Sequence, residues 1–527
     1  MKKVIDLSES TTKSYSVHSD DVEATINVLH RKNDHVPTYS VEYPEFKEAT
    51  RTVLDDIKHE ITRRVDIEEK EILDPKSVEK IKGEFIERSK EVTKEFFPKL
   101  DKEEVSTIAG RLTHQMYGLG RIEILLSDDD LEEIVINCAE EPIWVYHKDF
   151  GWLKTDIVLE NESKIYNYSS VIGRRVGKQI TNLRPLLDAH LPSGDRVNAT
   201  LFPITTQGNT ITIRKFARNP WTITHFIDPE NGTLSKEIAA LLWISIQYEM
   251  NAIIAGGTGS GKTSMLNTLT PFIPPNQRIV TIEDTRELNL PQYLHWVPMT
   301  TREPNPEGKG KVSMLDLMVN SLRMRPDRIL VGEIREKKQA EVLFEAMLTG
   351  HSVYSTLHAN TAQEVKRRMS NPPIDIPETM FESLHLTCVQ YRDRRSGIRR
   401  TRELAEISTK PKRKGEGVDL QVRTLYRWKP NKDTFEKIRD SERLIDELKE
   451  HTSMSKREVK ENLREKEEVL EWFLENDLKT TNSVGKVVAE YYTNKEEVLD
   501  LVRDNSSPDK ILPEDVIKEL KKRGLRD

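Results

Sequence analysis

The residues best suited to chemistry lie together in one glycine-rich segment near the middle of the chain. This segment satisfies the pattern G-x-x-x-x-G-K-[ST] at every fixed position. Its glycines let consecutive backbone N–H groups curl round a phosphate, and the helix expected after it adds positive potential. Lys262 would reach the β- and γ-phosphate oxygens of a nucleoside triphosphate, and the Thr263 hydroxyl would bind Mg²⁺. The expected nucleotide-binding residues are Gly256, Gly257, Thr258, Gly259, Ser260, Gly261, Lys262, Thr263 and Ser264.

The residues on either side of this segment predict the elements that hold it in place. Ala252–Ala255 is a short apolar run typical of a buried strand, and Ser264–Leu269 fits the first turns of a helix. A strand, a glycine loop and a helix in this order are the context in which the pattern binds phosphate. A chance glycine-rich turn before a helix is the alternative, but it is not expected to match so many residues in the right context. The sequence therefore predicts a nucleoside triphosphate site.

Two glutamates farther along the chain are suited to hold Mg²⁺ or to orient an attacking water molecule. Glu283 follows the apolar run Ile279–Ile282, and Glu333 follows the apolar run Arg328–Val331 after one intervening residue, Gly332. Acidic groups at the carboxyl end of a parallel strand are well placed for either task. Gly332 stands where the aspartate that usually ends such a strand is expected, which departs from the general Walker B pattern. The alternative for the first segment is a solvated acidic loop, and the sequence leaves open which glutamate activates water.

A histidine follows a third apolar strand. His358 comes just after the run Ser352–Ser355, at the edge where the phosphate site is expected. An isolated histidine is more often structural, but one beside a phosphate can sense the γ-phosphate. Spacing alone favours neither interpretation. The predicted catalytic residues are therefore Lys262, Glu283, Glu333 and His358, and the predicted metal ligands are Thr263, Glu283 and Glu333.

The composition of the 527-residue chain restricts its class. The formal net charge is −7 and charged residues make up 32% of the chain, which indicates a soluble protein without the bulk basic character that nucleic-acid binding requires. The two cysteines, Cys138 and Cys388, are far apart and suit a reducing cytoplasm better than a zinc or disulfide framework. The N-terminal apolar run ends at Asp6, which does not fit a signal peptide. The longest apolar stretch, Ile238–Ala255, is interrupted by polar residues and predicts a helix followed by a strand.

Changes in sequence texture divide the chain into five segments. We expect a charged helical region at 1–105, an α+β domain at 106–218, a linker at 219–233, an α/β domain with a parallel sheet at 234–407, and a strand pair with helices at 408–527. The first segment contains the expected helices, and the second contains three clear strand signals. A Ser-x-x-Glu capping box predicts a further helix in the last segment. These elements are Glu45–Val65, Ser77–Phe97, Glu133–Asn137, Ile143–Tyr146, Thr210–Arg214, Leu420–Tyr426, Thr434–Ile438 and a helix after Ser455.

Taken in order, these motifs resemble the secretion-superfamily ATPases that power type II secretion, type IV pili and archaeal surface filaments. The segment around Glu283 is similar to the Asp box of that family, the strand ending at Glu333 to its atypical Walker B, and the segment around His358 to its His box. The resemblance covers roughly residues 40 to 500. It includes the segments Gly118–Glu123, Leu191–Asn198 and Arg400–Ile407. The charged helices at both ends look most like the archaeal branch.

The resemblance implies a fold, a reaction and partners. It implies a RecA-like ATPase domain preceded by a PAS-like α+β domain, assembled as a homohexameric ring that binds ATP and Mg²⁺. Family arginines reach the phosphates, and the matching positions are Arg196, Arg214 and Arg302; the alternative for any one of them is a surface ion pair. The implied protein is cytoplasmic and meets the membrane only indirectly, through a polytopic platform protein. No direct nucleic-acid contact is expected.

Two other functions compete with an assembly or export motor. The first is a DNA-handling or conjugative export motor built on a related core, against which the acidic net charge argues. The second is an ATP-gated assembly scaffold with little turnover, against which the intact set Lys262, Glu283, Glu333 and His358 argues. The sequence does not indicate whether the driven machine is an archaellum, a pilus or a secretion system.

Overall fold

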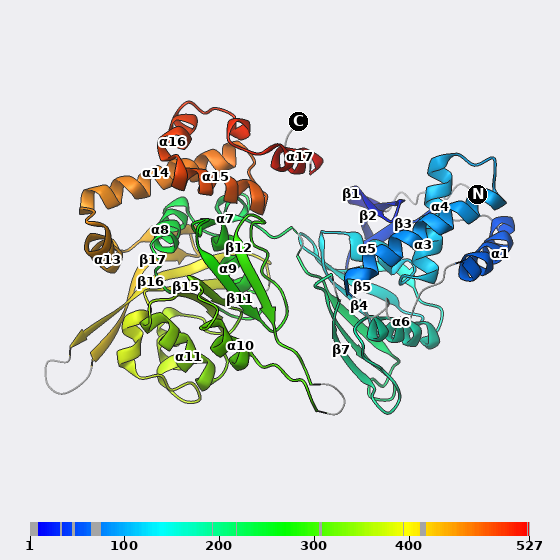
Figure 1. The fold of residues 1–527 in the computed structure, drawn as a ribbon, viewed down its shortest axis with the longest axis horizontal. Coiled ribbons are helices and arrows are strands. Elements are labelled where there is room, and N and C mark those ends of the chain that lie inside the picture. Colours follow the sequence, from blue (N-terminus) through cyan, green and yellow to red (C-terminus); the bar gives the residue numbers. More distant parts are fainter. Residues whose placement is uncertain are drawn as a thin grey trace. The chain divides into compact units, whose positions relative to one another are not determined.

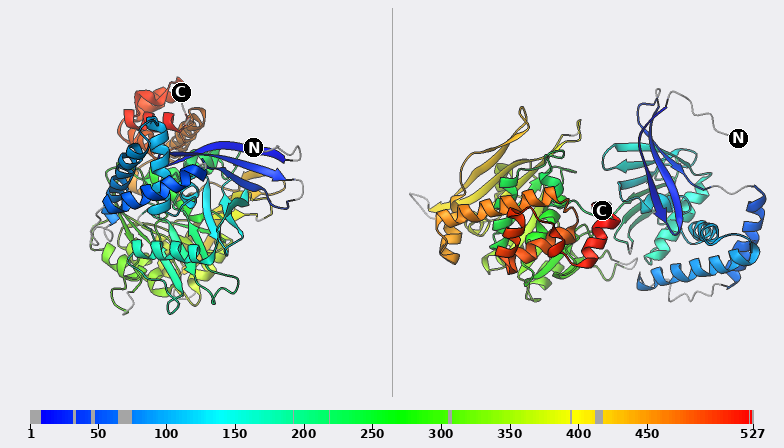
Figure 2. Two further views of the ribbon diagram at one scale, coloured as in Figure 1. Left: turned by 90° about the vertical axis from the view of Figure 1, so that its right-hand side faces the viewer. Right: turned by 90° about the horizontal axis from the view of Figure 1, so that it is seen from above.

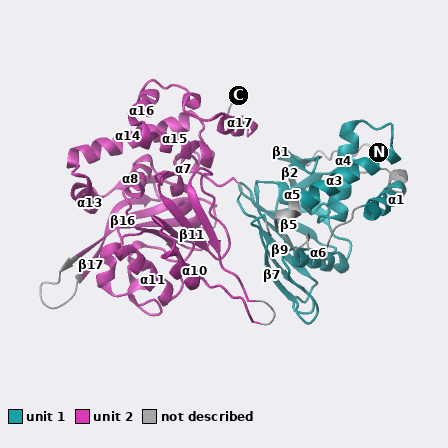
Figure 3. Cartoon of the chain, in the orientation of Figure 1, with its two compact units in different colours: residues 1–217 teal, residues 218–527 magenta. Residues whose placement is uncertain are grey.

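The computed structural model describes residues 9–31, 34–44, 48–64, 75–191, 193–217, 219–304, 308–393, 395–411, 418–523 and 525. The chain forms two compact units, Met1–Ala217 (unit 1) and Arg218–Asp527 (unit 2), which Figure 3 draws in different colours. Each unit is built on its own nine-stranded sheet (Figure 1).

The sheet of unit 1 has the strand order β1-β2-β3-β6-β5-β4-β9-β8-β7. Neighbouring strands are antiparallel except β3 and β6, which are parallel. The three strands expected in this part of the chain are confirmed as β4, β5 and β9. The bounds are β1 (Glu9–Ser19), β2 (Val22–Arg31), β3 (Thr38–Glu42), β4 (Leu131–Ile136), β5 (Pro142–His147), β6 (Gly151–Val158), β7 (Leu186–His190), β8 (Arg196–Thr200) and β9 (Thr210–Arg214).

The start of the chain differs from the helical region expected at 1–105. Strands β1 to β3 occupy most of residues 9–42 and join the sheet of unit 1. The sequence does carry a signal for β2, because Val22, Ala24, Ile26 and Val28 alternate with less buried residues. The polar composition around them hid this alternation. Residues 1–8 fall under the same expectation and lie outside the described residues.

Five helices complete the described part of unit 1. The two helices expected between residues 45 and 97 are confirmed as α1 and α3, and positions 45–47 and 65 lie outside the described residues. Helices α1, α3 and α4 share a small apolar core that includes Ile57, Phe85 and Leu112, and Figure 1 shows them gathered together. The bounds are α1 (Glu48–Arg64), α3 (Pro75–Phe96), α4 (Lys102–Met116), α5 (Ile122–Ser127) and α6 (Glu162–Arg175).

The sheet of unit 2 has the order β12-β11-β13-β14-β10-β15-β16-β17-β18. The first six strands are parallel and the last three are added antiparallel. All the strands expected here are confirmed, and the side chains of the central strands β10, β11, β13 and β14 are buried on both faces, as in α/β proteins. The bounds are β10 (Ala252–Gly256), β11 (Arg278–Glu283), β12 (His295–Thr300), β13 (Arg328–Val331), β14 (Ser352–Leu357), β15 (Leu386–Arg392), β16 (Arg399–Pro411), β17 (Val418–Lys429) and β18 (Thr434–Lys437).

Helices cover both faces of this sheet (Figures 1 and 2). One apolar core lies under α7 to α9 and the C-terminal helices, and a second lies under α10 to α12. The bounds are α7 (Ile223–Ile227), α8 (Lys236–Gln247), α9 (Lys262–Leu269), α10 (Met314–Ser321), α11 (Lys337–Leu348), α12 (Ala362–Ser370), α13 (Glu442–Thr452), α14 (Lys456–Glu475), α15 (Thr481–Thr493), α16 (Lys495–Arg503), α17 (Glu514–Lys522) and the short 3-10 helices η1 (Thr270–Phe272), η2 (Glu378–Ser383) and η3 (Pro508–Lys510).

Two segments lie differently from the expected division. The segment 219–233, expected as a linker, contains α7, and its Ile223 and Phe226 are buried in the core of unit 2. Apolar side chains spaced along one helical turn explain this burial. The segment 408–527 is part of the same compact unit, because β16 to β18 extend the sheet and α14 lies against α8. The capping box that begins at Ser455 is present at the start of α14, as predicted.

Candidate active site

The phosphate loop (residues 256–263) joins the central parallel strand β10 to helix α9. Gly259 and Gly261 have φ angles of 69° and 89°, which side chains rarely tolerate. A Cβ on Gly256 would lie 2.3 Å from the Ser260 Oγ and 2.6 Å from the Gln390 carbonyl oxygen. The N-cap residue of α9 is Gly261, which has no side chain with which to accept from the first N–H groups of the helix. The loop therefore has the form of an anion cradle.

The topology explains why residues distant in sequence meet at this loop. The neighbouring strands β11, β13, β14 and β10 are parallel and in register, so their carboxyl ends meet at one edge. Glu283 ends β11, Glu333 follows β13, and His358 follows β14. The sheet edge that carries the phosphate loop, with Lys262, thus also carries the other three predicted catalytic residues. This is the edge at which open α/β sheets bind ligands.

A chain of polar contacts joins the phosphate loop to the acidic residues. The Lys262 ammonium donates to the Gly257 carbonyl oxygen at 3.1 Å and lies 3.4 Å from the His358 Nδ1. The His358 Nε2 lies 2.9 Å from the Glu333 Oε1. With Lys262 as the donor, Nδ1 accepts and the Nε2–H faces the carboxylate. Partial burial and then the positive charge of Lys262 lower the pKa of His358, although Glu333 opposes this.

Arg335 extends the chain to a second strand end. Its Nη2 lies 2.5 Å from the Glu333 Oε2, and its Nη1 donates to the Asp284 Oδ2 at 3.0 Å. Asp284 follows Glu283, so the two acidic segments are bridged by one guanidinium. Neither Arg335 nor Asp284 was predicted as a site residue. Their only sequence signal is position, because each lies one or two residues beyond a predicted glutamate.

Glu283 has an environment unlike that of Glu333. Its side chain is 2% exposed, and its Oε1 accepts from the backbone N–H groups of Glu287 at 2.9 Å and Leu288 at 3.0 Å. Its Oε2 is buried and accepts no hydrogen bond from the described residues. Burial raises the pKa of the Glu283 carboxyl to about 7, although the two backbone hydrogen bonds oppose this. A buried oxygen without a donor suits a cation or a bound water.

These residues fit a magnesium ion. Mg²⁺ prefers hard oxygen ligands, and the site offers the hydroxyl of Thr263 at the start of α9 and the Glu283 oxygen that accepts no hydrogen bond from the described residues. Glu333, the third predicted ligand, could bind the ion only by giving up its contact with His358 or Arg335. The surroundings of Gly332 explain why glycine stands where such strands usually end in aspartate. A Cβ there would lie 3.6 Å from the Glu283 Cγ, so an aspartate would bring a second carboxylate against a buried one.

The three predicted arginines are divided between the two units. Arg196 of β8 lies opposite Arg214 of β9 in the sheet of unit 1, and its Nη2 pairs with the Asp188 Oδ2 at 2.7 Å. Arg302 belongs to unit 2, where its Nε donates to the Gly310 carbonyl oxygen at 2.6 Å in the loop after β12. The paired arrangement in unit 1 suits binding of one anion by two guanidinium groups.

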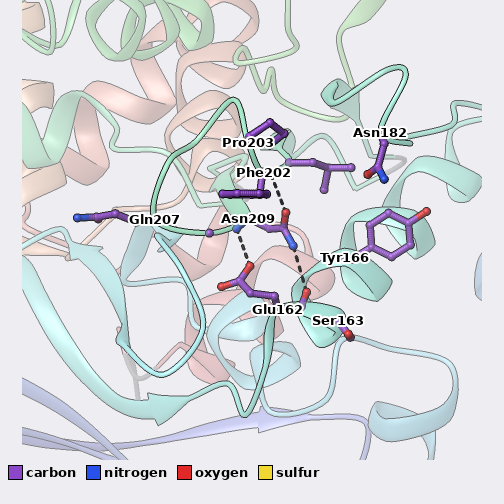
Figure 4. Close-up of a pocket in the computed structure, with 10 residues that line it drawn as sticks. Glu162, Ser163, Tyr166, Asn182, Phe202, Pro203, Gln207 and Asn209 are labelled. Atoms are coloured by element: carbon purple, nitrogen blue, oxygen red, sulfur yellow. Dashed lines mark hydrogen bonds between the residues drawn. The ribbon is translucent and has the colours of Figure 1, made fainter.

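A surface hollow of about 590 Å³ in unit 1 is a separate feature (Figure 4). Glu162 lines it, but the two oxygens of its carboxylate accept from the backbone N–H groups of Ala139 at 2.7 Å and Asn209 at 2.6 Å. Figure 4 shows the Asn209 side chain directed back to the loop and helix that surround it. The carboxylate therefore holds two loops together. The predicted catalytic residues lie elsewhere in the chain, at the edge of the unit 2 sheet that carries the phosphate loop.

A glycine loop at the carboxyl edge of a parallel sheet, with a lysine, glutamates and a histidine around it, defines a phosphate-loop nucleotide-binding protein. The chain belongs to the Type II/IV secretion system protein family, whose model matches residues 132–497. The ATPases of this family hydrolyse ATP. Among the helices that the structure describes, none combines the length and the apolar character needed to cross a bilayer.

Individual relatives are similar over part of the chain. The uncharacterized protein MJ0900 of Methanocaldococcus jannaschii is 36% identical over 342 residues, which are 64% of this chain and 60% of that protein. A putative conjugal transfer protein of Mycobacterium tuberculosis is 32% identical over 265 residues, 49% of this chain and 74% of that protein. The crystal structure of the ATPase DotB from Legionella pneumophila covers 72% of this chain and 94% of its own, with 21% identity and a TM-score of 0.39. The chain thus spans about 60% of the length of the first of these relatives.

Proposed function

We propose that this protein is a Mg²⁺-dependent ATPase that drives a pilus-type or secretion-type machine. The observation that carries the proposal is the chain of contacts from Lys262 through His358 and Glu333 to Arg335 and Asp284. Such a chain can respond to the γ-phosphate, because Lys262 is the residue that a phosphate would draw away. Membership of an ATPase family supports the same reaction.

We assign different tasks to the two glutamates. Both Glu333 oxygens are engaged, one by His358 and the other by Arg335, so Glu333 positions these partners. The Glu283 Oε2 accepts no hydrogen bond from the described residues, so it is available to orient the attacking water. Mg²⁺, held directly by the Thr263 hydroxyl, would neutralise charge on the transferred phosphoryl group. The permanent charge of Lys262 contributes in the same sense.

We further propose a homohexamer in which Arg196, Arg214 and Arg302 supply cations to the phosphates. Guanidinium groups suit this task because they bind phosphate oxygens through two parallel N–H groups. Nucleotide binding and release would then drive movement against a polytopic membrane protein at the cytoplasmic face. Dilution tests the assembly: specific ATPase activity should fall as light scattering detects the loss of hexamers. Activity that is unchanged in a monomer would exclude the ring.

The sharpest test of the reaction is phosphate release from purified protein with and without Mg²⁺. We expect ATP hydrolysis that requires Mg²⁺ and that is lost in Lys262→Ala. The thermal unfolding midpoint of this variant, measured without nucleotide, should equal that of the wild type. Wild-type protein that binds ATP without releasing phosphate would indicate a nucleotide-gated scaffold instead. A hydrolysis rate in Lys262→Ala close to that of the wild type would contradict the assignment of the phosphate loop.

A DNA-handling motor is the second candidate. It is favoured by the similarity to a protein named for conjugal transfer, whereas the net charge of −7 argues against it. An ATPase assay with added DNA distinguishes the two functions. A hydrolysis rate that increases severalfold with single-stranded or duplex DNA at physiological salt would support the DNA-handling motor, and no response would support the assembly or export motor.

A further inference from the structure

The phosphate loop has a second flank, opposite the one that carries His358. Strand β10 lies between β14 and β15, and both neighbours run parallel to it. Just as His358 follows β14, Arg392 ends β15, two residues beyond Gln390, which pairs with Gly256. Parallel strands end at the same edge of a sheet, so Arg392 reaches the loop from the side away from His358.

Two arginines contact this second flank. The Nη1 of Arg392 lies 2.7 Å from the position that a Cβ on Gly259 would occupy. The Nε of Arg399, at the start of β16, donates to the Gly259 carbonyl oxygen at 3.4 Å, and its Cδ lies 3.9 Å from a Cβ built on Gly261. Both guanidinium groups are therefore beside the glycines that leave the loop backbone open.

The turn between β15 and β16 is held in one shape by its own hydrogen bonds. The backbone N–H of Asp393 donates to the Ile398 carbonyl oxygen at 2.9 Å, and the Asp393 carboxylate accepts from the Ser396 hydroxyl at 2.9 Å. Below the turn, the Gln390 side chain donates to the Thr401 hydroxyl at 3.0 Å. These contacts fix the spacing of the two strand ends that carry Arg392 and Arg399, so the pair is pre-organised.

We propose that Arg392 and Arg399 form a clamp on the α- and β-phosphates of the bound nucleotide. The inference rests on the proposed function. Lys262, His358 and Glu333 lie on the β14 flank, where the γ-phosphate end belongs, so the β15 flank faces the phosphates nearer the nucleoside. Guanidinium groups bind such oxygens in a bidentate manner. The clamp therefore holds ADP as firmly as ATP and slows product release.

Calorimetric titration of the full-length protein with ADP and with a non-hydrolysable ATP analogue tests the clamp. In Arg392→Ala and in Arg399→Ala we expect Kd to rise about tenfold or more, by the same factor for both nucleotides. Arg395→Ala is the matched control, because this exposed arginine lies on the same turn, and it should leave both Kd values unchanged. Thermal unfolding without nucleotide verifies that each variant is folded.

The outcomes separate the clamp from the proposed function. If the wild type binds both nucleotides and the two alanine variants bind them equally well, the clamp is wrong and the proposed function stands. If only the ATP analogue loses affinity, the arginines face the γ-phosphate and the clamp is wrong. A wild type that binds neither nucleotide would overturn both proposals. Should an alanine variant unfold, Arg399→Lys and Arg392→Lys keep the charge, and the clamp then requires a smaller but equal loss for ADP and the analogue.

Discussion

Asp128 of unit 1 and Glu283 of unit 2 are both buried carboxylates, but they differ in how many of their oxygens accept hydrogen bonds. Asp128 of unit 1 is 3% exposed, and its Oδ2 accepts from the Tyr15 hydroxyl at 2.7 Å and the Tyr39 hydroxyl at 2.5 Å. Its Oδ1 accepts from the backbone N–H of Asp130 at 2.8 Å. Glu283 of unit 2 is 2% exposed, yet only one of its two oxygens accepts a hydrogen bond from the described residues.

The difference separates a structural carboxylate from a functional one. Tyr15 and Tyr39 belong to β1 and β3, so Asp128 fastens the N-terminal strands to the turn between α5 and β4. Every acceptor position used there strengthens the fold. The open oxygen of Glu283 destabilises the folded state. Such a destabilising group is retained where the binding of a ligand to it offsets the lost free energy.

Removal of the phosphate-loop cation should have the largest effect. We expect Lys262→Ala to lower kcat by about 10³-fold or more, because it removes the charge nearest the transferred phosphoryl group. Lys262 is only partly buried, so the denaturation midpoint should stay close to that of the wild type. Lys337→Ala, an exposed lysine at the start of α11, is the control. A phosphate-release assay that shows equal rates for Lys262→Ala and Lys337→Ala would remove Lys262 from the site.

Local patterns predicted the phosphate loop and the parallel strands because each is specified by a short stretch of sequence. The glycines, Lys262 and the apolar runs carry their signal within a few residues. Contacts such as Arg335 with Asp284 and Arg399 with Gly259 depend on strand order, which no local pattern encodes. The strands β1 to β3 were missed for another reason: β2 carries an alternation of buried and less buried residues, but the polar residues around it led to its assignment to the charged helical region. Tertiary pairing decided their structure.

Substitution of the two glutamates should affect catalysis in different ways. We expect Glu283→Gln to lower kcat about 10²-fold with little change in the Kd for ATP, because the amide keeps the shape but not the charge that orients water. Glu333→Gln should lower kcat and also release His358, whose pKa should fall when its anionic partner is neutralised. The pH dependence of kcat in each variant distinguishes the two. Equal losses of binding and turnover would mark either residue as structural.

The structural carboxylate should show the opposite behaviour. We expect Asp128→Ala to lower the free energy of unfolding of unit 1 by about 2–4 kcal/mol, because the two tyrosine hydroxyls lose their acceptor. The Kd for ADP should not change, since the phosphate loop lies in unit 2 and Asp128 holds β1 and β3, not β8 and β9, which carry Arg196 and Arg214. Tyr15→Phe, which removes one donor and leaves the other, should cost about 1 kcal/mol. Urea unfolding and ADP titration measure the two effects, and a weaker ADP affinity in Asp128→Ala would contradict the separation of roles.

Lys466 of α14 is a third buried charge, and it lies between these two extremes. Its side chain is 0% exposed. Its Nζ donates to the Asn462 Oδ1 at 2.6 Å and to the Tyr491 hydroxyl at 3.4 Å, and it lies 5.2 Å and 4.8 Å from the ring centres of Trp243 and Tyr491. Trp243 belongs to α8, so the ammonium sits where the C-terminal helices meet the core of unit 2. Its contacts satisfy the group only in part.

The stability of unit 2 should therefore depend on pH through Lys466. Burial lowers the pKa of this ammonium from 10.5 to about 7, with Lys495 acting in the same direction and Glu465 opposing both. Between these two pKa values the unfolded state binds more protons than the folded state, so stability rises with pH, and the cost of burying the charge is fully present below pH 7. We expect Lys466→Met to stabilise the protein by about 1–2 kcal/mol near pH 6 and by less near pH 9. Urea unfolding at both pH values measures how the difference in stability between the variant and the wild type shrinks as the pH rises. Lys456→Met, at the exposed start of the same helix, should show no such change with pH. A Lys466→Met variant that is less stable by the same amount at both pH values would mean that the hydrogen bonds and ring contacts outweigh the cost of the buried charge.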